Sequence, residues 1–504
     1  MRRRALLGGT LGTAAALAAG SARADKAQDT LRVTWRDAIP DIDFYYNALR
    51  TGLVVSHHVW DTLIYRDPAS FQLKPQLAST WRAVDDRTIE FELRPNVTFH
   101  DGSKFSADDV VYTVDLVRND AKLAVPSNYG FIDSARKIND LRVQIVLSRV
   151  FPAALEYMSM VLPIYPKAYR ERVGAAFSQR PVGTGPYQVT KVDGTSSIEL
   201  ERNDTYFDGP KGKPAIRFLV INEVGEPSDE LAALLEGRAD WIWNISTDQL
   251  PKVAAMPSLQ VLTSESMRVG YLNMDAAGRT GPDSPFLSQK VREAVAHAID
   301  RPAMARQFMP GGSRVLDAPC YPTQFGCDAA VATRWDYDPA KAKALLAEAG
   351  FSEGFATEIV SYLLPQMVQA VQGYLAAVGI RATVSQPQID LVVRRSAEGL
   401  NPIEMGSWGS YSINDVSAFL PYFFDGGAHD YARDAEVTKL IAEAGAITDL
   451  DRRRADYSAA IRRITAEAYY LPLFSFVTNY AMSRTLNFRP SHDELPRFYL
   501  ASWR

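Results

Sequence analysis

One short segment of the sequence, residues 97–117, gathers side chains that could do chemistry. It contains a histidine and four aspartates: His100, Asp101, Asp108, Asp109 and Asp115. An imidazole near several carboxylates resembles the donor set of a metal site, and it also suits general acid–base catalysis. The elements that must hold these residues decide between a reactive site and a structural one.

The surrounding pattern favours a structural interpretation. Residues 88–93 alternate polar and apolar side chains, which is the period of a half-buried strand, and residues 100–102 are typical of a turn. Ser106 is a candidate N-cap for a helix that begins after it. Asp108 and Asp109 then fall in the first helical turn, where negative charge suits the exposed N–H groups and the helix dipole. The segment therefore predicts a strand, a turn and a capped helix.

Other catalytic motifs are absent from the sequence. It contains no Gly-x-Ser-x-Gly nucleophile elbow, P-loop, His-Glu-x-x-His helix or dinucleotide fingerprint. Only His57 and His58 are adjacent among the 6 histidines, and neighbouring residues on a helix point about 100° apart, so they are poor joint ligands. We expect no enzyme, no metal site and no cofactor.

Residues 1–24 have the pattern of an export signal. Three arginines precede an apolar run over residues 5–19, and residues 22–24 place small side chains at the spacing of a cleavage site. Paired arginines before a mild apolar core resemble a twin-arginine signal, and a general secretory signal is the alternative. We expect a soluble periplasmic protein that begins near Asp25, without a lipid anchor because no cysteine follows the cleavage site.

The charge balance argues against nucleic acid as a partner. The sequence has 55 Lys and Arg residues against 59 Asp and Glu residues, and removal of the four arginines of residues 1–24 leaves a net charge of −8. Phosphate binding would need clustered positive charge. Beyond the export signal there is no run of about 20 apolar residues, so no membrane helix is expected.

The two cysteines, Cys320 and Cys327, enclose a short loop that contains Pro and Gly. In an oxidising compartment such a pair favours a disulfide bond. A zinc site would need more ligands, and no histidine lies close in the sequence. We therefore predict a Cys320–Cys327 disulfide.

Strand-like and helix-like segments alternate along the sequence, which predicts an α/β protein. Residues 31–35 and 218–222 are typical of strands, whereas residues 291–299 and 339–349 are typical of helices. About 480 residues exceed one usual core, so several lobes are expected. Because no long Gly/Ser linker is present, the lobes must be joined by short crossings, such as strands that pass between them.

Residues 93–112 combine a strand with an FHDG turn and an FSADDV helix start. Further distinctive pieces follow at residues 59–63, 183–187, 202–207, 291–301, 337–342 and 471–474. In this order and spacing, the pieces resemble the family 5 solute-binding proteins of ABC importers, the peptide, nickel and opine class of extracytoplasmic receptors. The resemblance runs from about Leu31 to Trp503.

This resemblance implies an α/β protein of the periplasmic-binding-protein type II fold, with two lobes that close on a ligand and an extra inserted domain. Domain I would comprise residues 25–57, 180–272 and 474–504, domain II the insert of residues 58–179, and domain III the opposing lobe of residues 273–473. A monomeric receptor of this kind encloses its solute between domains I and III without a cofactor. It then docks on the permease subunits of the importer in the inner membrane.

The solute is less clear from the sequence. In the dipeptide receptors of this family, an Asp after a Gly-Trp stretch binds the peptide ammonium group, and an Arg in another segment binds the carboxylate. Here Tyr411 falls near the position of that Asp, Asp415 comes later, and residues 361–365 contain no Arg. Three interpretations remain: a receptor for a short peptide or a peptide-like or opine-like solute, a receptor for an oligosaccharide or other polar solute stacked on Trp and Tyr, and an exported hydrolase. The small number of histidines argues against nickel and haem.

Segments that face the cleft in relatives supply the ligand-binding candidates: Tyr45, Asn128, Tyr129, Thr184, Gly185, Trp241, Arg268, Tyr271, Asn273, Trp408, Tyr411 and Asp415. We expect roughly half of them to contact ligand, because transfer of loop positions by analogy is imprecise. Trp241 and Trp243 flank one residue, so one of the two should lie in the core. Asn273 has the alternative of tying down a crossing strand, and Arg268 that of pairing with an acid across the hinge.

Overall fold

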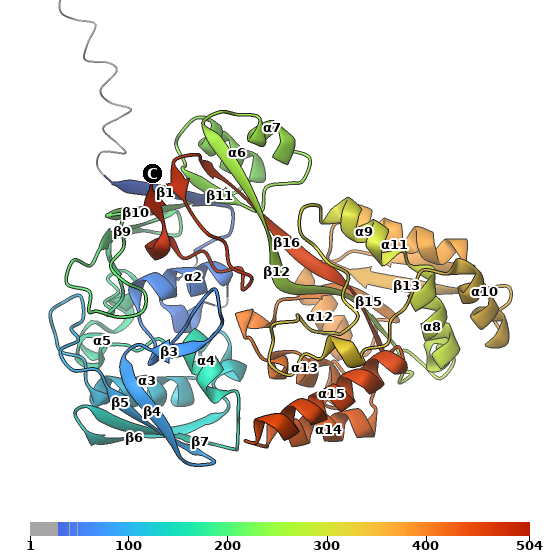
Figure 1. The fold of residues 1–504 in the computed structure, drawn as a ribbon, viewed down its shortest axis with the longest axis horizontal. Helices are drawn as coiled ribbons and strands as arrows, with labels where there is room; N and C mark the ends of the chain where they lie inside the picture. Colours follow the sequence, from blue (N-terminus) through green and yellow to red (C-terminus); the bar gives the residue numbers. More distant parts are fainter. Residues whose placement is uncertain (1–28, 40, 48) are drawn as a thin grey trace, which may run out of the picture.

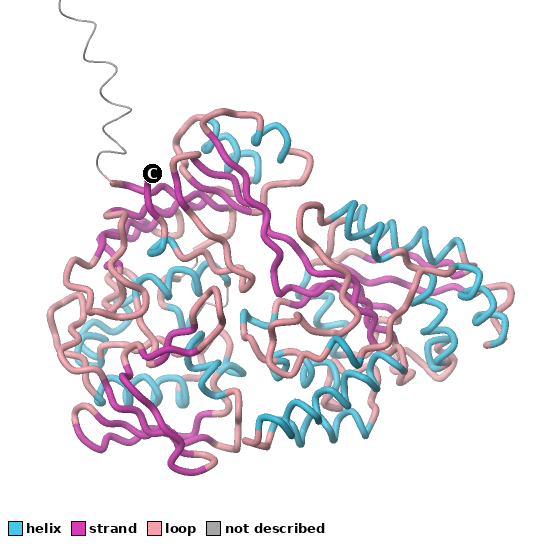
Figure 2. Tube along the Cα trace, viewed as in Figure 1, coloured by secondary structure: helices cyan, strands magenta, loops and turns pink. Residues whose placement is uncertain are grey.

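The computed structural model describes residues 29–39, 41–47 and 49–504, and the predicted export signal lies outside them. Two lobes stand side by side and are connected by a pair of long strands (Figures 1 and 2). The part of the chain before and after these strands, up to residue 258 and from residue 484, is called the N-terminal lobe below. Residues 275–469 are called the C-terminal lobe.

A mixed sheet of ten strands extends through both lobes. Its strand order is β14 (Ile380–Ser385), β13 (Phe355–Ser361), β15 (Ile403–Trp408), β12 (Leu259–Met274), β16 (Tyr470–Ser483), β11 (Trp241–Trp243), β1 (Thr30–Trp35), β10 (Phe218–Glu223), β9 (Ser197–Arg202) and β8 (Tyr187–Asp193). The long strands β12 and β16 pair antiparallel and pass from one lobe to the other (Figure 1). They are the kind of strand crossing that the absence of a linker predicts.

A smaller antiparallel sheet lies at the far end of the N-terminal lobe (Figure 1). Its order is β4 (Ala78–Asp85), β5 (Thr88–Leu93), β7 (Arg142–Leu147) and β6 (Ile132–Asn139). Two short ribbons complete the strands, β2 (Ile64–Arg66) with β3 (Leu73–Pro75), and β17 (Leu486–Asn487) with β18 (Ser502–Trp503).

The helices divide between the lobes. The N-terminal lobe contains α2 (Arg50–Val59), α3 (Ala107–Asn119), α4 (Ala154–Val161), α5 (Lys167–Val173), α6 (Pro227–Leu235) and α7 (Leu250–Ala254). The C-terminal lobe contains α8 (Gln289–Ala298), α9 (Arg301–Phe308), α10 (Pro339–Glu348), α11 (Pro365–Ala377), α12 (Ile389–Ala397), α13 (Leu420–Phe424), α14 (Ala435–Gly445) and α15 (Leu450–Ala466).

The segment at residues 97–117 has the predicted structural role. Strand β5 precedes it, and Ser106 caps α3 in a capping box that Asp109 completes from the first turn. Asp109 also accepts a hydrogen bond from the backbone N–H of Lys167 at 2.9 Å. The local rules succeed here because the capping residues satisfy backbone groups of their own helix.

Each lobe has its own apolar interior. One buried cluster runs through the N-terminal lobe and its small sheet, and it includes Ile413 and Ala418 of the C-terminal lobe. Two further clusters fill the C-terminal lobe, one beneath α8 and α11 and one among α13, α14 and α15. The lobes therefore have separate cores, and they touch through a small apolar contact.

The predicted Cys320–Cys327 disulfide is present in the structure. Among the described residues, no helix has the length and apolar character needed to cross a bilayer. The described side chains also form no group of three or more His, Cys, Asp or Glu that could hold a metal ion. The division into domains I, II and III at the expected boundaries stays a prediction.

Candidate ligand-binding site

A cavity of about 770 Å³ lies between the two lobes. Its volume is within the range of pockets that enclose small organic molecules, which is about 300–1,000 Å³. Its wall combines side chains of both lobes with side chains of the crossing strands. Tyr45 and Arg50 come from the N-terminal lobe, Arg268 and Tyr271 come from β12, and Trp408 comes from β15 in the C-terminal lobe.

The structure brings seven of the twelve predicted candidates to the cavity wall. They are Tyr45, Asn128, Tyr129, Arg268, Tyr271, Trp408 and Tyr411. The other five, Thr184, Gly185, Trp241, Asn273 and Asp415, lie outside the wall.

Thr184 and Gly185 belong to a loop that packs against the end of α2. The hydroxyl of Thr184 donates a hydrogen bond to Asp61 at 2.9 Å, and a Cβ at Gly185 would lie 2.5 Å from the carbonyl oxygen of His58. His100 holds the same loop, since its Nε2 lies 2.9 Å from the Gly185 carbonyl oxygen. Burial lowers the pKa of His100 to about 4, so the ring is neutral near pH 7. Thr184 and Gly185 were expected to face the cleft, and their loop instead packs within the N-terminal lobe.

Trp241 lies in the core, and Trp243 lines the cavity in its place. The Trp241 ring packs edge-on against Phe498, with a centroid separation of 5.0 Å, and it also contacts Tyr480. Both indoles point to the same side of β11, because residues two apart on a strand share a face. One of the two was expected in the core, and it is Trp241, the one that the resemblance had named as a candidate for the site.

Asp415 forms a buried ion pair outside the cavity wall. Its two carboxylate oxygens each accept a hydrogen bond of 2.8 Å from the guanidinium group of Arg453. It also caps the following turn through the backbone N–H of Ser417. A carboxylate neutralised in this way is not free to bind an ammonium group, so its role here is structural.

Two arginines share one carboxylate at the side of the cavity next to the N-terminal lobe. Glu494 lies 2.7 Å from Arg50 and 3.2 Å from Arg268. Burial opposes ionisation of Glu494, but the two guanidinium groups outweigh it and lower the pKa to about 2. Glu494 has a φ of 59°, a left-handed conformation that few non-Gly residues adopt. Arg268 therefore pairs with an acid, which was the alternative role expected for it, and it also lines the cavity.

Glu404 was not among the predicted candidates, although it lines the cavity. It accepts hydrogen bonds from the Tyr271 hydroxyl at 2.8 Å and from the Asn401 side-chain amide at 2.9 Å. Burial raises the pKa of Glu404, and its hydrogen bonds offset only part of this effect. Asn273 lies directly opposite Glu404 in the β12–β15 ladder. An acidic residue inside the otherwise apolar or small-residue strand β15 is the sequence signal that could have drawn attention to it.

Aromatic rings form much of the wall in the C-terminal lobe. Trp408 stacks on Tyr422 at a centroid distance of 4.4 Å and contacts Tyr411 edge-on. The Trp408 indole N–H donates to the Ala418 carbonyl at 3.0 Å, so the ring is fixed from behind. Residues 410–412 all have positive φ, between 48° and 63°, which is a left-handed turn at the cavity edge.

The comparison with protein families decides what kind of protein this is. The model described as "Bacterial extracellular solute-binding proteins, family 5 Middle" matches residues 72–430, which is more than half of the chain. The chain belongs to this family. The identification from the order of short sequence pieces is thereby confirmed.

Relatives and solved structures agree with this assignment. This family 5 protein is 25% identical to heme-binding protein A of Haemophilus influenzae over 456 residues, which cover 83% of this chain and 82% of the relative. It is 29% identical to the glutathione-binding protein GsiB of Pectobacterium atrosepticum over 312 residues, 60% of this chain and 58% of the relative. The crystal structure of a dipeptide binding protein from Pseudoalteromonas sp. SM9913 in complex with Met-Leu has a TM-score of 0.77 at 21% identity, covering 94% of this chain and 100% of that one. The protein therefore has the type II fold of periplasmic binding proteins, as the resemblance predicted.

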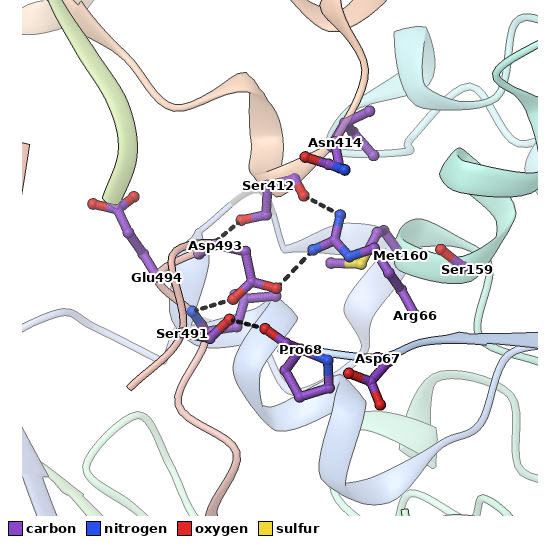
Figure 3. A network of polar contacts seen from close by, with 12 residues as sticks. Arg66, Asp67, Pro68, Ser159, Met160, Ser412, Asn414, Ser491, Asp493 and Glu494 are labelled. Carbon is purple, nitrogen blue, oxygen red and sulfur yellow. Dashed lines mark hydrogen bonds and ion pairs between the residues drawn. The ribbon is translucent and has the colours of Figure 1, made fainter. Parts of the chain in front are cut away.

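The two lobes of the family 5 protein are also tied together beside the cavity (Figure 3). Arg66 of the N-terminal lobe donates to Asp493 at 2.6 Å and to the carbonyl oxygen of Ser412, in the C-terminal lobe, at 2.5 Å. The Ser412 hydroxyl in turn donates to the carbonyl oxygen of Asp493 at 2.7 Å. Glu156, which also contacts Arg66, accepts a hydrogen bond from the backbone N–H of Asn414 across the same junction at 2.7 Å. The described conformation is therefore one in which the lobes meet.

Proposed function

We propose that this protein is the periplasmic solute receptor of an ABC importer. It binds a short peptide, or a peptide-like or opine-like solute, between its lobes and delivers it to the permease subunits in the inner membrane. Membership in a family of extracellular solute-binding proteins supports the receptor role. The glutathione-binding relative supports the peptide class, because glutathione is itself a peptide.

The cavity between the lobes is the observation on which this proposal depends. Its wall holds Arg50 and Glu494 from one lobe and Glu404 and Trp408 from the other. A solute that contacts both sets of groups stabilises the conformation in which the lobes meet, because it can make all of its contacts only there. The permease then has a closed receptor to recognise, and the solute leaves unchanged.

The charges in the wall favour a peptide-like solute over an oligosaccharide. A neutral sugar would need exposed ring faces, whereas one face of Trp408 is already stacked on Tyr422. Charged solute groups would instead find both signs of charge in the wall, which neutral hydroxyl groups would not exploit. A hydrolase has less support, because the described residues of the cavity wall include no histidine or cysteine that could act as base or nucleophile.

A thermal-shift screen of the purified protein tests this proposal. The compounds are mixed short peptides, opines and oligosaccharides, each tested at the same concentration. A ligand that binds only the native state raises the melting temperature, by a stabilisation of about 2.7 kcal/mol at 100 times its dissociation constant. We expect peptides or opines to raise it and to be recovered intact after incubation. A response to oligosaccharides alone, or recovery of cleaved peptides, would refute the proposal.

A further inference from the structure

Glu404 is a buried carboxylate whose hydrogen-bonding neighbours carry no positive charge. Glu404 is only 6% exposed, and the groups that donate to it are the Tyr271 hydroxyl and the Asn401 amide. No ion pair among the described residues includes it, in contrast to Glu494 and Asp415. Neutral donors orient a carboxylate, but they leave its charge in place.

The charged side chains of the cavity wall include more negative groups than positive ones. In the described residues they are Asp37, Arg50, Arg268, Glu404 and Glu494, three carboxyl groups against two guanidinium groups. Glu494 forms ion pairs with both guanidinium groups. The positive charge of Arg50 also partly offsets the effect of burial on the pKa of Asp37. The carboxylate without a cationic neighbour is therefore Glu404, and it lies on the opposite lobe.

The surroundings of Glu404 suit a cation that comes from outside the protein. The rings of Tyr271, Tyr362, Trp408 and Tyr422 line the same cavity. A ring face that stays open to the cavity attracts a positive charge through the ring quadrupole. Tyr422 offers no such face, because Trp408 and His429 each stack on it at a centroid distance of 4.4 Å. An imidazolium of the protein is not available for this purpose, because burial lowers the pKa of His429, which stacks on Tyr422.

We infer that Glu404 binds a positively charged ammonium group of the solute within this aromatic part of the cavity. The inference rests on the proposed receptor function and adds to it the position and charge of one end of the solute. Tyr271 and Asn401 fix the Glu404 carboxylate, and the solute's ammonium supplies the cation that the protein lacks. Glu404 thereby takes the place of Asp415, whose charge Arg453 neutralises.

Two peptide libraries test this inference. One is an equimolar mixture of dipeptides and tripeptides with free amino ends, and the other is the same mixture with acetylated amino ends, which carry no positive charge. Each library is equilibrated with the purified protein, the retained members are quantified by mass spectrometry, and the best-retained peptide is titrated by calorimetry with and without its acetyl group. We expect acetylation to weaken binding by about 30-fold or more, because one partner of a buried charge pair is lost.

Two variants, Glu404→Gln and Glu358→Gln, show whether Glu404 binds the ammonium group. Glu404→Gln should weaken binding of the free-amine peptide to the same extent, and acetylation should then have no further effect. Glu358→Gln is the matched control, because Glu358, on the neighbouring strand β13, pairs with Arg395 of α12 and does not line the cavity. Glu358→Gln should retain wild-type affinity. A merely structural role for Glu404 would lower the melting temperature of the unliganded Glu404→Gln protein, which we expect to be unchanged or higher.

Other outcomes separate failure of the Glu404 role from failure of the proposed function. If acetylated peptides bind as tightly as free ones, or if Glu404→Gln retains wild-type affinity for the free amine, the receptor function stands and the role of Glu404 is refuted. If neither library is retained, the peptide class is removed from the proposed function, and the inference fails with it.

Discussion

Asp493 at the junction of the lobes and Glu404 in the cavity wall are both buried carboxylates, but they differ in their partners. Asp493 is fully buried and contacts the guanidinium groups of Arg66 and Arg497, each at 2.6 Å. Glu404 is 6% exposed and has neutral donors only. The pKa values move in opposite directions. Burial opposes ionisation of both groups, but the two arginines outweigh it and lower the pKa of Asp493, whereas the pKa of Glu404 is raised.

The difference distinguishes a structural cluster from a site that a ligand completes. A buried charge with matched partners holds elements together, and the loss of one partner leaves the others uncompensated. A buried charge without a cation is a cost to the unliganded protein, which a solute of opposite charge removes on binding. The same residue type therefore contributes to stability in one region of the molecule and to recognition in the other.

Removal of Arg66 should give the largest effect. Arg66→Ala leaves Asp493 and Glu156 without one of their cations and removes the contact with the Ser412 carbonyl. We expect the free energy of unfolding to fall by about 3–5 kcal/mol, the usual cost of breaking a buried ion pair from one side. Urea denaturation followed by tryptophan fluorescence measures this change.

Lys74→Ala is the control for this prediction. Lys74 forms an ion pair with Asp67, close to Arg66 in the sequence, but about half of its side chain is exposed. Exposed pairs contribute little, so the denaturation midpoint should barely move. Equal effects of the two variants would show that the buried ion pairs of Arg66 stabilise the protein no more than the exposed pair of Lys74 does.

The pH dependence of stability should have opposite signs for the two carboxylates. The raised pKa of Glu404 means that its protonated form is favoured in the folded protein, so its contribution is present in acid and is lost as the pH rises through the folded pKa, above 4.5. The lowered pKa of Asp493 means that its contribution is present above the unfolded value of 3.8 and is lost as the pH falls through the folded pKa.

Denaturation of the unliganded protein between pH 4 and pH 8 measures the contribution of Glu404. Glu404→Gln should match the wild type in acid and become more stable than it by about 1–3 kcal/mol at pH 8, the usual cost of a buried charged group without its partner. Tyr271 and Tyr422, which have raised pKa values, stay protonated over this range, and the contribution of His429 cancels in the difference between the two proteins. A constant difference across the range would contradict the assignment.

The sequence predicted those parts of the fold that depend on neighbouring residues. The cap of α3 at Ser106 was identified, because its side chain bonds to an N–H group two residues away. The disulfide was also predicted, since its two cysteines are separated by only 7 positions. The lack of a linker pointed to strand crossings, and β12 and β16 supply them.

The binding site was predicted less completely because its decisive contacts are remote in the sequence. Glu494 lies 226 residues after Arg268, so no local pattern links them. The partner of Asp415, Arg453, lies 38 residues away, and its charge could not be assigned in advance. Trp241 and Trp243 share one strand face, and only the packing of Tyr480 and Phe498 decides which indole is covered. Alternation within a strand identifies a face, but it does not show where the cavity opens along it.

Substitution of Ser412 should have the smallest effect, because it removes one hydrogen bond between the two lobes, from the Ser412 hydroxyl to the Asp493 carbonyl. Ser412→Ala removes the 2.7 Å hydrogen bond to the Asp493 carbonyl while the backbone contact with Arg66 remains possible. The closed conformation should lose about 0.5–1.5 kcal/mol relative to the open one, the usual net value of one hydrogen bond. Peptide affinity measured by calorimetry should therefore fall by a few-fold, with little change in the denaturation midpoint of either lobe.

Ser491→Ala is the matched control, because its hydroxyl bonds to Pro68 at 3.0 Å within the N-terminal lobe and does not cross the junction (Figure 3). If both serine variants weaken binding equally, the hydrogen bond across the junction does not report closure.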